Sequence, residues 1–452
     1  MVSLPYSVIL IYIFIQVWQP SSANAQPRVM QSLRLEDTIA IALENNRDIQ
    51  NAVEEVSKAD YRVLEAASGA MPQINGFWDS QKTLKQQVFV ISFPDSEGVI
   101  RKSRLKVGTD YNMSLGATLT QPLYVGGKVG TALEAAGIYR EMSNETLETV
   151  QQNVVMGVVT AFNGVLLARQ VNRISVESLE QAERHLENVE NLFDAGLATE
   201  YDLLRARVNV ANLRPNVIDS ENNIKISLLK LKEIMGADPT MDIDISGELT
   251  EPDTTLFAQA SPEVAFDNRP DVLVSQKNVD LYEKNIKITR GDFLPIITAG
   301  TTFMYSGNFD EFKYDAADWT PFWYASVSLS FPIFSGLNNY SRYKQAKIDH
   351  QKARTDYRKM LDATEIEVNE AVMNLSRAVN TIQSQKLNVQ EAQRAVELAG
   401  LRYTNGKATQ LEVLDAQLAL EVARNNMATA LFDGQNAEIA LKKSLGLIII
   451  EH

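Results

Sequence analysis

The chain of 452 residues contains no cysteine and only three histidines, one of which, His452, is its last residue. Without cysteine there are no disulfides, no thiolate nucleophiles, no zinc sites with cysteine ligands and no lipid attachment through an N-terminal cysteine. His185 and His350 fall within predicted long helices, and we interpret both as surface or seam residues. Hydrolase and metalloenzyme mechanisms lack their usual residues. We therefore predict that the protein is not an enzyme and has no cofactor and no resident metal ion.

Basic residues are also in deficit, with 43 Lys and Arg against 57 Asp and Glu and a formal net charge of −14. A negatively charged chain repels phosphate backbones unless a local basic stripe compensates, and we identify no such stripe in the sequence. Nucleic acid is therefore not an expected partner.

Long hydrophobic runs are missing from the chain after residue 25, because no window there holds 18 uninterrupted apolar residues. The sequence therefore predicts no transmembrane helix, although a membrane barrel would hide its apolar residues in alternation. The apolar run at residues 8–18 spans only about 16 Å as a helix, and it is followed by Ala23-Asn24-Ala25, a pattern typical of signal peptidase sites. We predict a signal peptide at residues 1–25. The alternative is a retained short anchor, since no Lys or Arg precedes the run.

The chain contains an internal repeat. Residues 121–127 (QPLYVGG) match residues 331–336 (FPIFSG), and residues 192–199 (LFDAGLAT) match residues 402–409 (RYTNGKAT), both at an offset of 210. Before residue 72 the offset is 223, so the first copy has a loop longer by 13 residues between positions 72 and 122. A constant offset over distant motifs indicates duplication. We predict one duplicated domain at residues 26–452, with repeat 1 at about 33–250 and repeat 2 at about 256–446.

Alternation of apolar with small or polar residues predicts strands in both repeats. It is clear at residues 111–119, 297–305 and 323–331, and least regular at residues 74–92. Period two over about nine residues fits a tilted membrane strand with one lipid-facing side. The alternative is an edge of a soluble β-sandwich, but nothing else in the sequence resembles a second sheet to cover it. We therefore favour a membrane barrel.

Helical patterns occupy most of the remaining chain. Each repeat begins with a helical segment, at residues 33–69 and 262–292, and the strands are followed by proline-free stretches at 128–194 and 337–404. Each long stretch predicts a helix of roughly 100 Å with a coiled-coil seam near its end. Second helices follow a glycine turn, at residues 200–235 and 410–445, and Pro215 predicts a kink or break in the first of them.

The predicted fold class is thus an α+β membrane protein, in which a duplicated helical coiled coil is joined to four strands per chain. Four strands cannot close a barrel, and open edges in lipid would leave unpaired backbone groups that cost several kcal/mol each. Closure through oligomerisation follows. Two chains would supply eight strands and three would supply twelve, and the strand count alone does not decide between them.

The matching segments at 121–127 and 331–336, the duplicated order of elements and the pattern YTNGKATQLEVLDA at 403–416 resemble the TolC family of outer-membrane efflux proteins. The resemblance covers essentially all of the mature chain. It implies a homotrimer with one shared twelve-stranded barrel in the lipid of the bacterial outer membrane and a helical tunnel through the periplasm. Such a protein is the exit duct of a tripartite efflux or type I secretion system. A periplasmic adaptor protein and an inner-membrane pump dock at its helical end.

Glu412 and Asp415 are the main candidates for a periplasmic gate, because a spacing of three places both carboxylates on one helix face. The resemblance implies that they point to the axis, where threefold symmetry makes two acidic rings that repel one another, attract cations and exclude anions. Glu412 replaces the aspartate that is usual in the family. The alternative is a solvated helix face whose charges stabilise the helix N-terminus.

The resemblance further implies a latch, in which the hydroxyl of Tyr403 bonds to Asp202 and holds the gate closed. Tyr403 also occupies a seam position, so packing alone is the alternative. The family's turn arginine is absent, because Ala408 stands in its place. The resemblance therefore supplies no charge-assisted latch at that position.

The turns that end the long helices are candidates for adaptor docking by the same resemblance, through Gly196, Leu197, Thr199, Gly406 and Thr409. Their local interpretation is helix reversal, in which glycine adopts a positive φ and threonine caps the next helix.

Strand–helix junctions are predicted at the two matching glycine motifs, where proline is expected to end the strand ladder. The four junction residues are Pro122, Gly126, Pro332 and Gly336.

Two other classes of function compete with the export duct. One is a barrel-anchored helical stalk with no conduction, and the other is a soluble periplasmic coiled-coil scaffold. The sequence does not identify the exported substrate, the adaptor or the class of pump.

Overall fold

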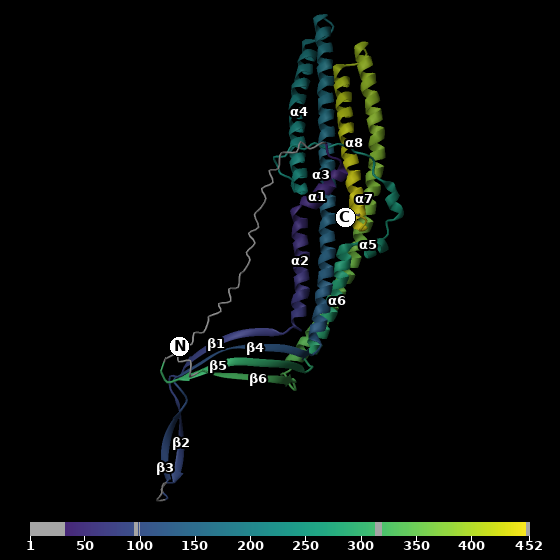
Figure 1. Cartoon of the computed structure of the whole chain (residues 1–452). Coiled ribbons are helices and arrows are strands. Elements are labelled where there is room, and N and C mark those ends of the chain that lie inside the picture. Colours follow the sequence, from purple (N-terminus) through teal and green to yellow (C-terminus); the bar gives the residue numbers. More distant parts are fainter. Residues whose placement is uncertain (1–31, 95–97, 99, 312–318, 449–452) are drawn as a thin grey trace.

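The computed structural model describes residues 32–94, 98, 100–311 and 319–448, so the predicted signal peptide lies outside the described residues. Figure 1 shows a long bundle of helices with a curved sheet at one end. The helices of the first half are α1 (Leu35–Asn45), α2 (Arg47–Ser68), α3 (Lys128–Asp194) and α4 (Glu200–Met235). Those of the second half are α5 (Pro262–Asn268), α6 (Pro270–Gly291), α7 (Asn338–Thr404) and α8 (Gln410–Ser444), preceded by the short 3₁₀ helix η1 (Thr254–Ala258).

The two halves have corresponding cores. In the first, helices α1 to α4, with the segments just before α1 and after α4, bury a cluster that consists of Leu33, Ala42, Ile49, Val154, Val158, Phe162, Val165, Leu166, Leu231, Met235, Ile243 and Ile245. In the second, η1, α5, α7 and α8 bury Leu256, Ala265, Val368, Ala371, Leu375, Leu441 and Leu445. Val158 and Leu231 correspond to Val368 and Leu441 at the repeat offset of 210.

The opening helix of each repeat is interrupted, contrary to the single segments expected from the sequence. The interruptions fall at Asn46 and Arg269, which are 223 residues apart and have extended backbones. Asn46 ends α1 and caps α2, because its side chain accepts hydrogen bonds from the backbone N–H groups of Asp48 and Ile49. Pro270, which has no N–H group, occupies the first position of α6.

Pro215 was expected to cause a kink or a break, and helix α4 runs through it as one helix, which excludes the break. Residues are buried on both sides of the proline, with Leu203 and Val210 before it and Leu231 after it. Packing of this face on α3 therefore outweighs the backbone hydrogen bond that proline cannot make.

Helix α3 contains a window that is long and apolar enough, by length and composition alone, to cross a membrane. The window is interrupted by polar residues, which is why the search for uninterrupted apolar residues missed it. Val158 and Val165 are fully buried in the first core. These apolar side chains of α3 thus pack inside the helical bundle.

The sheet contains the four strands that the alternation predicted, in the order β1-β4-β5-β6 and antiparallel throughout. Their bounds are β1 (Gln73–Lys82), β4 (Tyr111–Val125), β5 (Ile296–Phe309) and β6 (Trp319–Ser330). The pairing of β4 with β5 joins the two repeats, and within the chain β1 and β6 are the edge strands.

The longer loop of the first repeat forms a separate hairpin, β2 (Gln87–Pro94) and β3 (Ile100–Val107), which the sequence analysis did not predict. The hairpin leaves the sheet at Lys82 and Tyr111, the ends of β1 and β4 furthest from the helices, and turns away from the other strands (Figure 1). The irregular region at 74–92 is therefore two strands rather than one.

The two junction prolines differ. Pro332 lies just beyond the last residue of β6, as expected. Pro122, however, lies inside β4 at a shift of register, and the strand continues to Val125. The irregularity accommodates the missing N–H of Pro122, and the pairing of β4 with β1 has already ended at Thr120.

A left-handed glycine turn follows each of these strands, with φ of 65° at Gly126 and 60° at Gly336. At Gly126 a side chain is also excluded by space, since a Cβ atom would overlap the carbonyl oxygen of Gly291. The next residue is left-handed in both copies, and in the second copy it is Leu337 rather than glycine. The turn therefore directs each strand into its long helix at the cost of one strained leucine.

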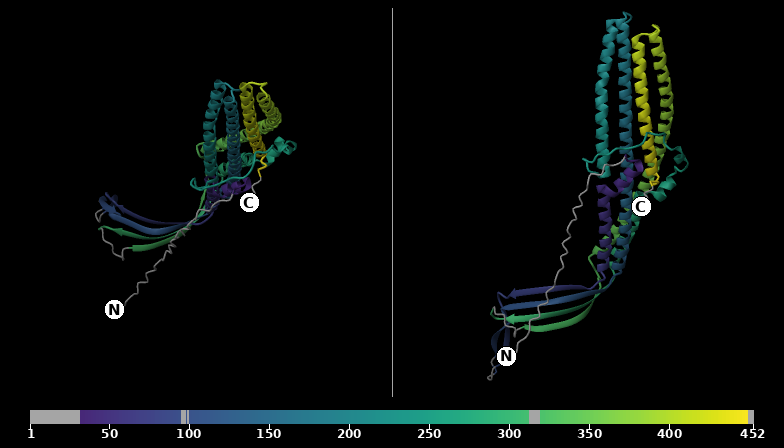
Figure 2. Two further views of the ribbon diagram at one scale, coloured as in Figure 1. Left: turned by 90° about the horizontal axis from the view of Figure 1, so that it is seen from above. Right: turned by 45° about the horizontal axis from the view of Figure 1, so that its top comes forward.

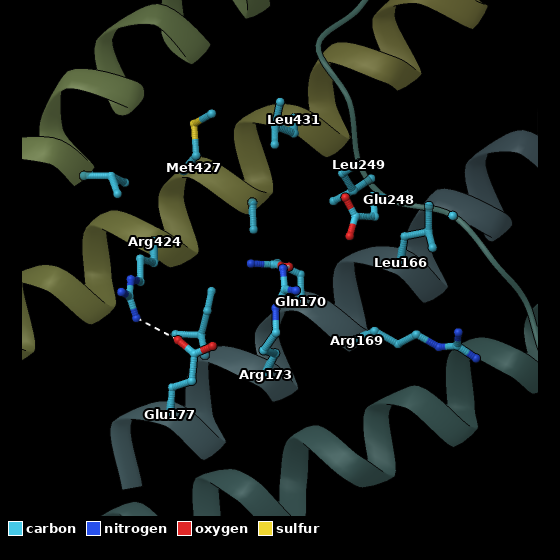
Figure 3. Close-up of a pocket in the computed structure, with 14 residues that line it drawn as sticks. Leu166, Arg169, Gln170, Arg173, Glu177, Glu248, Leu249, Arg424, Met427 and Leu431 are labelled. Atoms are coloured by element: carbon cyan, nitrogen blue, oxygen red, sulfur yellow. Dashed lines mark hydrogen bonds and ion pairs between the residues drawn. The ribbon is translucent and has the colours of Figure 1, made fainter. Parts of the chain in front are cut away.

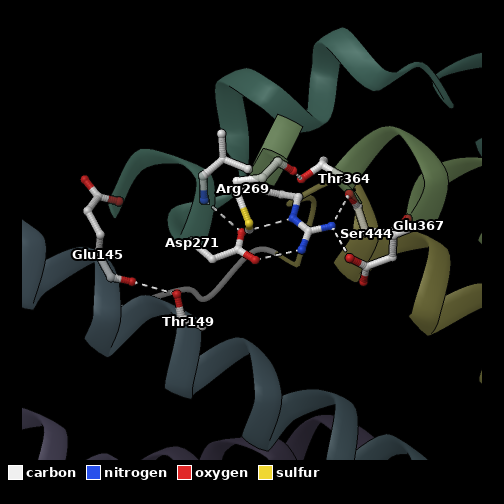
Figure 4. Close-up of polar contacts among 9 residues, drawn as sticks. Glu145, Thr149, Arg269, Asp271, Thr364, Glu367 and Ser444 are labelled. Atoms are coloured by element: carbon white, nitrogen blue, oxygen red, sulfur yellow. Dashed lines mark hydrogen bonds and ion pairs between the residues drawn. The ribbon is translucent and has the colours of Figure 1, made fainter. Parts of the chain in front are cut away.

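Arg269 links three elements where α5 meets α6 (Figure 4). Its guanidinium donates two hydrogen bonds to Asp271, at 3.0 and 2.7 Å, one to Glu367 of α7 at 2.7 Å, and one to the carbonyl of Ser444 of α8. Burial opposes the charged form of Arg269, but the two carboxylates outweigh this effect and raise its pKa. Burial likewise opposes ionisation of Asp271, and Arg269 prevails and lowers the pKa of that carboxyl group.

Replacing Arg269 with alanine is expected to destabilise the helical bundle by about 3 kcal/mol, because Asp271 would keep its half-buried charge without a partner. Thermal or denaturant unfolding of the detergent-purified protein measures this loss. The control is Arg394→Ala, which removes an exposed pair with Glu397 and should cost less than about 1 kcal/mol. Equal losses in the two variants would contradict the role of Arg269.

Candidate gate at the helix tips

The two helical hairpins, α3–α4 and α7–α8, lie side by side and turn at the same end of the molecule (Figure 2). Each turn is a Schellman motif with a left-handed glycine, at φ 73° for Gly196 and 66° for Gly406. The next residue donates its N–H back across the turn, from Leu197 to Leu192 at 2.7 Å and from Lys407 to Arg402 at 2.8 Å. Both tips therefore have one backbone design.

A capping box starts the second helix of each hairpin. Thr199 accepts a hydrogen bond from the N–H of Asp202, and the Asp202 carboxylate accepts from the N–H and hydroxyl of Thr199, at 3.1 and 2.7 Å. Thr409 and Glu412 make the same exchange in the second hairpin. Two of the predicted gate acids thus have a structural role in starting helices.

The tips are joined to one another by Gln410, which the sequence analysis did not single out. Its side-chain amide donates a hydrogen bond to the backbone carbonyl of Asp202 at 3.1 Å, and the residue is only 4% exposed. Its amide oxygen is buried without a hydrogen-bond partner among the described residues. A lone glutamine at the first position of a helix carries no sequence signal of this contact, which depends on the docking of the hairpins.

Tyr403 packs from α7 into the first hairpin, against a small cluster of buried Val189, Leu203 and Ala206. Burial, and then the negative charge of Asp202, raises the pKa of its hydroxyl. The structure brings these two residues near each other, but no hydrogen bond joins them in the described part of the chain. The described part of the single chain thus lacks the expected latch. The physical reason is that the Asp202 carboxylate already accepts hydrogen bonds from the N–H and hydroxyl of Thr199.

Glu412 and Asp415, the two acids of the predicted ring, differ in their surroundings. Glu412 is 3.5 Å from Arg402, which also donates a hydrogen bond to the carbonyl of Lys407 within the turn. Arg402 supplies a positive charge at this tip although Ala408 replaces the family's turn arginine. Asp415 is exposed and lines a groove of about 290 Å³ between α4 and α8, together with Arg205 and Glu421. Asp415 has no hydrogen-bond or ion-pair partner among the residues that the structure describes.

A second groove, of about 650 Å³, lies between α3 and α7 just behind the tip and contains His185. His185 is 8% exposed, its ring centroid is 5.5 Å from that of Tyr403, and its Nε2 has no partner among the described residues. Burial lowers the pKa of His185. Arg184 and Glu397 also line this groove. The expected position of His185 was a surface or a seam, and the structure places it in the seam.

A third groove, of about 480 Å³, lies further from the tips between α3 and α8 (Figure 3). Arg424 of α8 pairs with Glu177 of α3 at 2.9 Å across it and also donates to Gln393 of α7. None of the predicted gate residues lines this groove. Its ion pair connects the two repeats along the bundle.

Acidification is expected to loosen the contact between α3 and α7 near the tip. Because burial lowers the pKa of His185, an opened tip with a solvated ring binds the proton more tightly, so the closed contact weakens as the pH falls below about 6.5. Hydrogen exchange of residues 182–206, corrected for its intrinsic pH dependence, should increase between pH 7.5 and 5.5. His185→Gln should abolish this change and His350→Gln should retain it, whereas a change that survives in His185→Gln would assign it to another group.

Comparison with known proteins gives a consistent assignment. The family described as "Outer membrane efflux protein" matches residues 38–237 and 262–447. The chain is 23% identical over 450 residues to the pyoverdine export outer membrane protein OpmQ of Pseudomonas putida, covering 95% of this chain and 91% of the relative. It is 24% identical over 324 residues to the outer membrane protein TolC of Escherichia coli, covering 70% and 65%.

Solved structures share the fold. A structure of CusC aligns with a TM-score of 0.74 at 20% identity, covering 93% of this chain and 96% of that one. The open state of the MtrE outer membrane channel of Neisseria gonorrhoeae aligns with a TM-score of 0.73 at 18% identity, covering 92% and 89%. The chain therefore belongs to the TolC-like outer membrane efflux protein family, and it is an efflux or secretion channel of tripartite systems in the bacterial outer membrane, with its helices in the periplasm, rather than an enzyme.

Proposed function

We propose that three copies of this chain form one exit duct, which carries substrates from an inner-membrane pump through the periplasm to the outside. The observation that carries this proposal is the pair of edge strands, β1 and β6, in a sheet that must lie in lipid. Inside the chain, β4 of one repeat pairs with β5 of the next. The equivalent pairing between copies joins β6 to β1 of the neighbour and closes a barrel of twelve strands, a size within the range of bacterial barrels.

The pump and a periplasmic adaptor are the partners that this function requires, because the duct itself contains no energy source. The relatives named above and the alkaline protease secretion protein AprF of Pseudomonas aeruginosa differ in what their names say is exported. One name refers to pyoverdine export and another to alkaline protease secretion, so membership of the family does not fix the chemical class of the substrate.

The gate of the duct is proposed to be an acidic ring at the tips, made by Asp415 with Glu412. Asp415 supports this role because it is exposed and unpaired in the described part of the chain. Three copies around an axis would repel one another by on the order of 1 kcal/mol per pair at 4 Å in water, and cations would relieve the repulsion. Glu412 contributes less charge, because Arg402 lies 3.5 Å away and Thr409 engages the same carboxylate.

The closed state is proposed to be held by contacts between the hairpins of one chain rather than by a hydroxyl–carboxylate bond. Gln410 reaches the carbonyl of Asp202, and Tyr403 packs into the first hairpin. Opening the tip must separate these groups. Tyr403 and Asp202 therefore remain gate residues in this proposal, through packing and through a backbone carbonyl respectively.

Docking of the adaptor is proposed at the two tip turns, through Gly196, Leu197, Thr199, Gly406 and Thr409. The turns support this role because they share one backbone design and lie at the free end of the bundle (Figure 2). Leu197 is 76% exposed at the very tip, where a large apolar side chain has no role in the fold.

Removal of the acidic ring is expected to enlarge the conductance of the purified protein in a planar bilayer severalfold and to reduce its preference for cations. The variant is Glu412→Ala/Asp415→Ala, since both changes take negative charge from the narrowest proposed point. Glu370→Ala/Glu391→Ala, which removes two exposed carboxylates from α7, is the control and should leave the current unchanged. A conducting wild type that is indifferent to the first variant would place the gate elsewhere. Silence of folded, inserted protein would favour the stalk.

A photo-crosslinking amino acid at position 197 is expected to capture a periplasmic adaptor protein in cells where the chain supports efflux. The same amino acid at position 84, which is exposed at the opposite end of the molecule, should not capture it. Leu197→Asp should reduce efflux by weakening this contact, and Leu84→Asp should not. Adaptor capture from position 84 but not 197 would reject the tips as the docking site.

A further inference from the structure

The β2–β3 hairpin has two chemically different faces. Directly opposite residues of an antiparallel pair project to the same side, and the register pairs Val88 with Lys106, Val90 with Arg104 and Ser92 with Lys102. Three cations therefore follow one another along β3 on one face. They are two residues apart, or about 7 Å.

In the described part of the hairpin, no acid faces this row. The residues opposite the three cations are Val88, Val90 and Ser92, and Lys102, Arg104 and Lys106 have no ion-pair partner among the residues that the structure describes. The row is a short local basic stripe, contrary to the expectation from a sequence of net charge −14 that none is present. A local positive surface on an acidic protein indicates an anionic partner.

The opposite face of the hairpin is mainly apolar. Phe89 pairs with Leu105 there, and Ile91 and Val107 continue the surface beside their partners Ser103 and Gln87. These four side chains are 36–53% exposed although they are large and apolar. An isolated two-stranded hairpin is at best marginally stable in water, so this face requires a cover.

The place of the hairpin in the fold indicates which side of the membrane it faces. Hydrogen bonds from Thr83 and Gln86 to Asp110 fix its base at the end of the sheet furthest from the helices. Since the helices extend into the periplasm, this end is at the cell exterior. The hairpin turns away from the other strands (Figure 1). It therefore emerges at the level where the outer leaflet presents its headgroups.

We propose that the β2–β3 hairpin binds the phosphorylated glycolipid of the outer leaflet, with Lys102, Arg104 and Lys106 contacting its phosphates and the Phe89–Leu105 face resting on its acyl boundary. Interfacial elements that place apolar side chains at the headgroup boundary and cations on the polar side bind anionic membranes in this way. The arrangement covers the apolar face and neutralises the row of cations. It is independent of how the periplasmic tips open.

The test measures binding of purified lipid A to the full-length assembly in uncharged detergent at low salt. The probes are the bis-phosphorylated form and the same lipid after enzymatic removal of both phosphates. Lys102→Gln/Arg104→Gln/Lys106→Gln should weaken binding of the phosphorylated form more than tenfold, because each cation contributes about fivefold near an anionic surface. The variant should bind the dephosphorylated form as the wild type does.

Matched variants separate charge from folding. Lys225→Gln/Lys230→Gln/Arg358→Gln removes three exposed cations from the helices and should leave binding unchanged. Lys102→Arg/Arg104→Lys/Lys106→Arg keeps the charges and should also bind normally. Phe89→Ser/Leu105→Ser should weaken the binding of both forms of the lipid. Heat-resistant oligomer on a gel confirms the fold of each variant.

Four results would overturn the proposal. The first is equal binding of the phosphorylated and dephosphorylated forms by the wild type, and the second is an unchanged affinity in the triple glutamine variant. The third is displacement of the lipid by inorganic phosphate at matched phosphate concentration, which would show a simple anion site. The fourth is loss of the oligomer in the hairpin variants with lipid binding intact, which would assign the hairpin to contacts between copies.

Discussion

The structure depends on the pairing of backbone groups in lipid, where an unpaired N–H or C=O group has no water to bond. The chain satisfies this requirement only in part, because its four-stranded sheet has edges at β1 and β6. The duplication of the chain shows how the two edge strands can be paired. The pairing of β4 with β5 already brings one repeat against the next, so the same geometry applied between copies continues the sheet. The proposed trimer needs no kind of strand contact that a single chain does not contain.

The helices follow the same rule with different chemistry. Within the chain α3 packs on α6 through ion pairs, at 2.6 Å for Lys284–Glu134 and 2.8 Å for Lys277–Glu141. At the repeat offsets, the positions corresponding to Glu134 and Lys284 are Lys344 and Tyr61. In the proposed assembly, the junction between repeats and the junction between copies therefore share a backbone arrangement but not the same charges.

Much of the fold follows from the sequence because its signals are local or periodic. Alternation predicted the four sheet strands, and the glycine turns predicted both helix reversals. The hairpin β2–β3 was missed because the alternation over residues 74–92 is irregular. The chain leaves the four-stranded sheet there after β1 and enters the separate hairpin at β2. The break at Asn46 was missed since a polar residue at a cap resembles one on a solvated helix face. The break at Arg269, in contrast, has a sequence signal in Pro270, because a proline disfavours helical backbone in the preceding residue. Gln410 and Arg402 act across the tips, and only the docking of the hairpins makes their partners apparent.

Two of the proposed gate acids also cap helices at the tips. An acid that caps a helix is less free to contact another copy or an ion. Asp202 and Glu412 both occupy the third position of a capping box, where a carboxylate is held by backbone N–H groups and by threonine. A carboxylate held in this way is poorly placed to contact a symmetry mate or a passing ion. Asp415 lies one turn further along α8 and has no capping role. In the proposed gate, the acid without a capping role, Asp415, is thus the one best placed to repel its counterparts in the other copies.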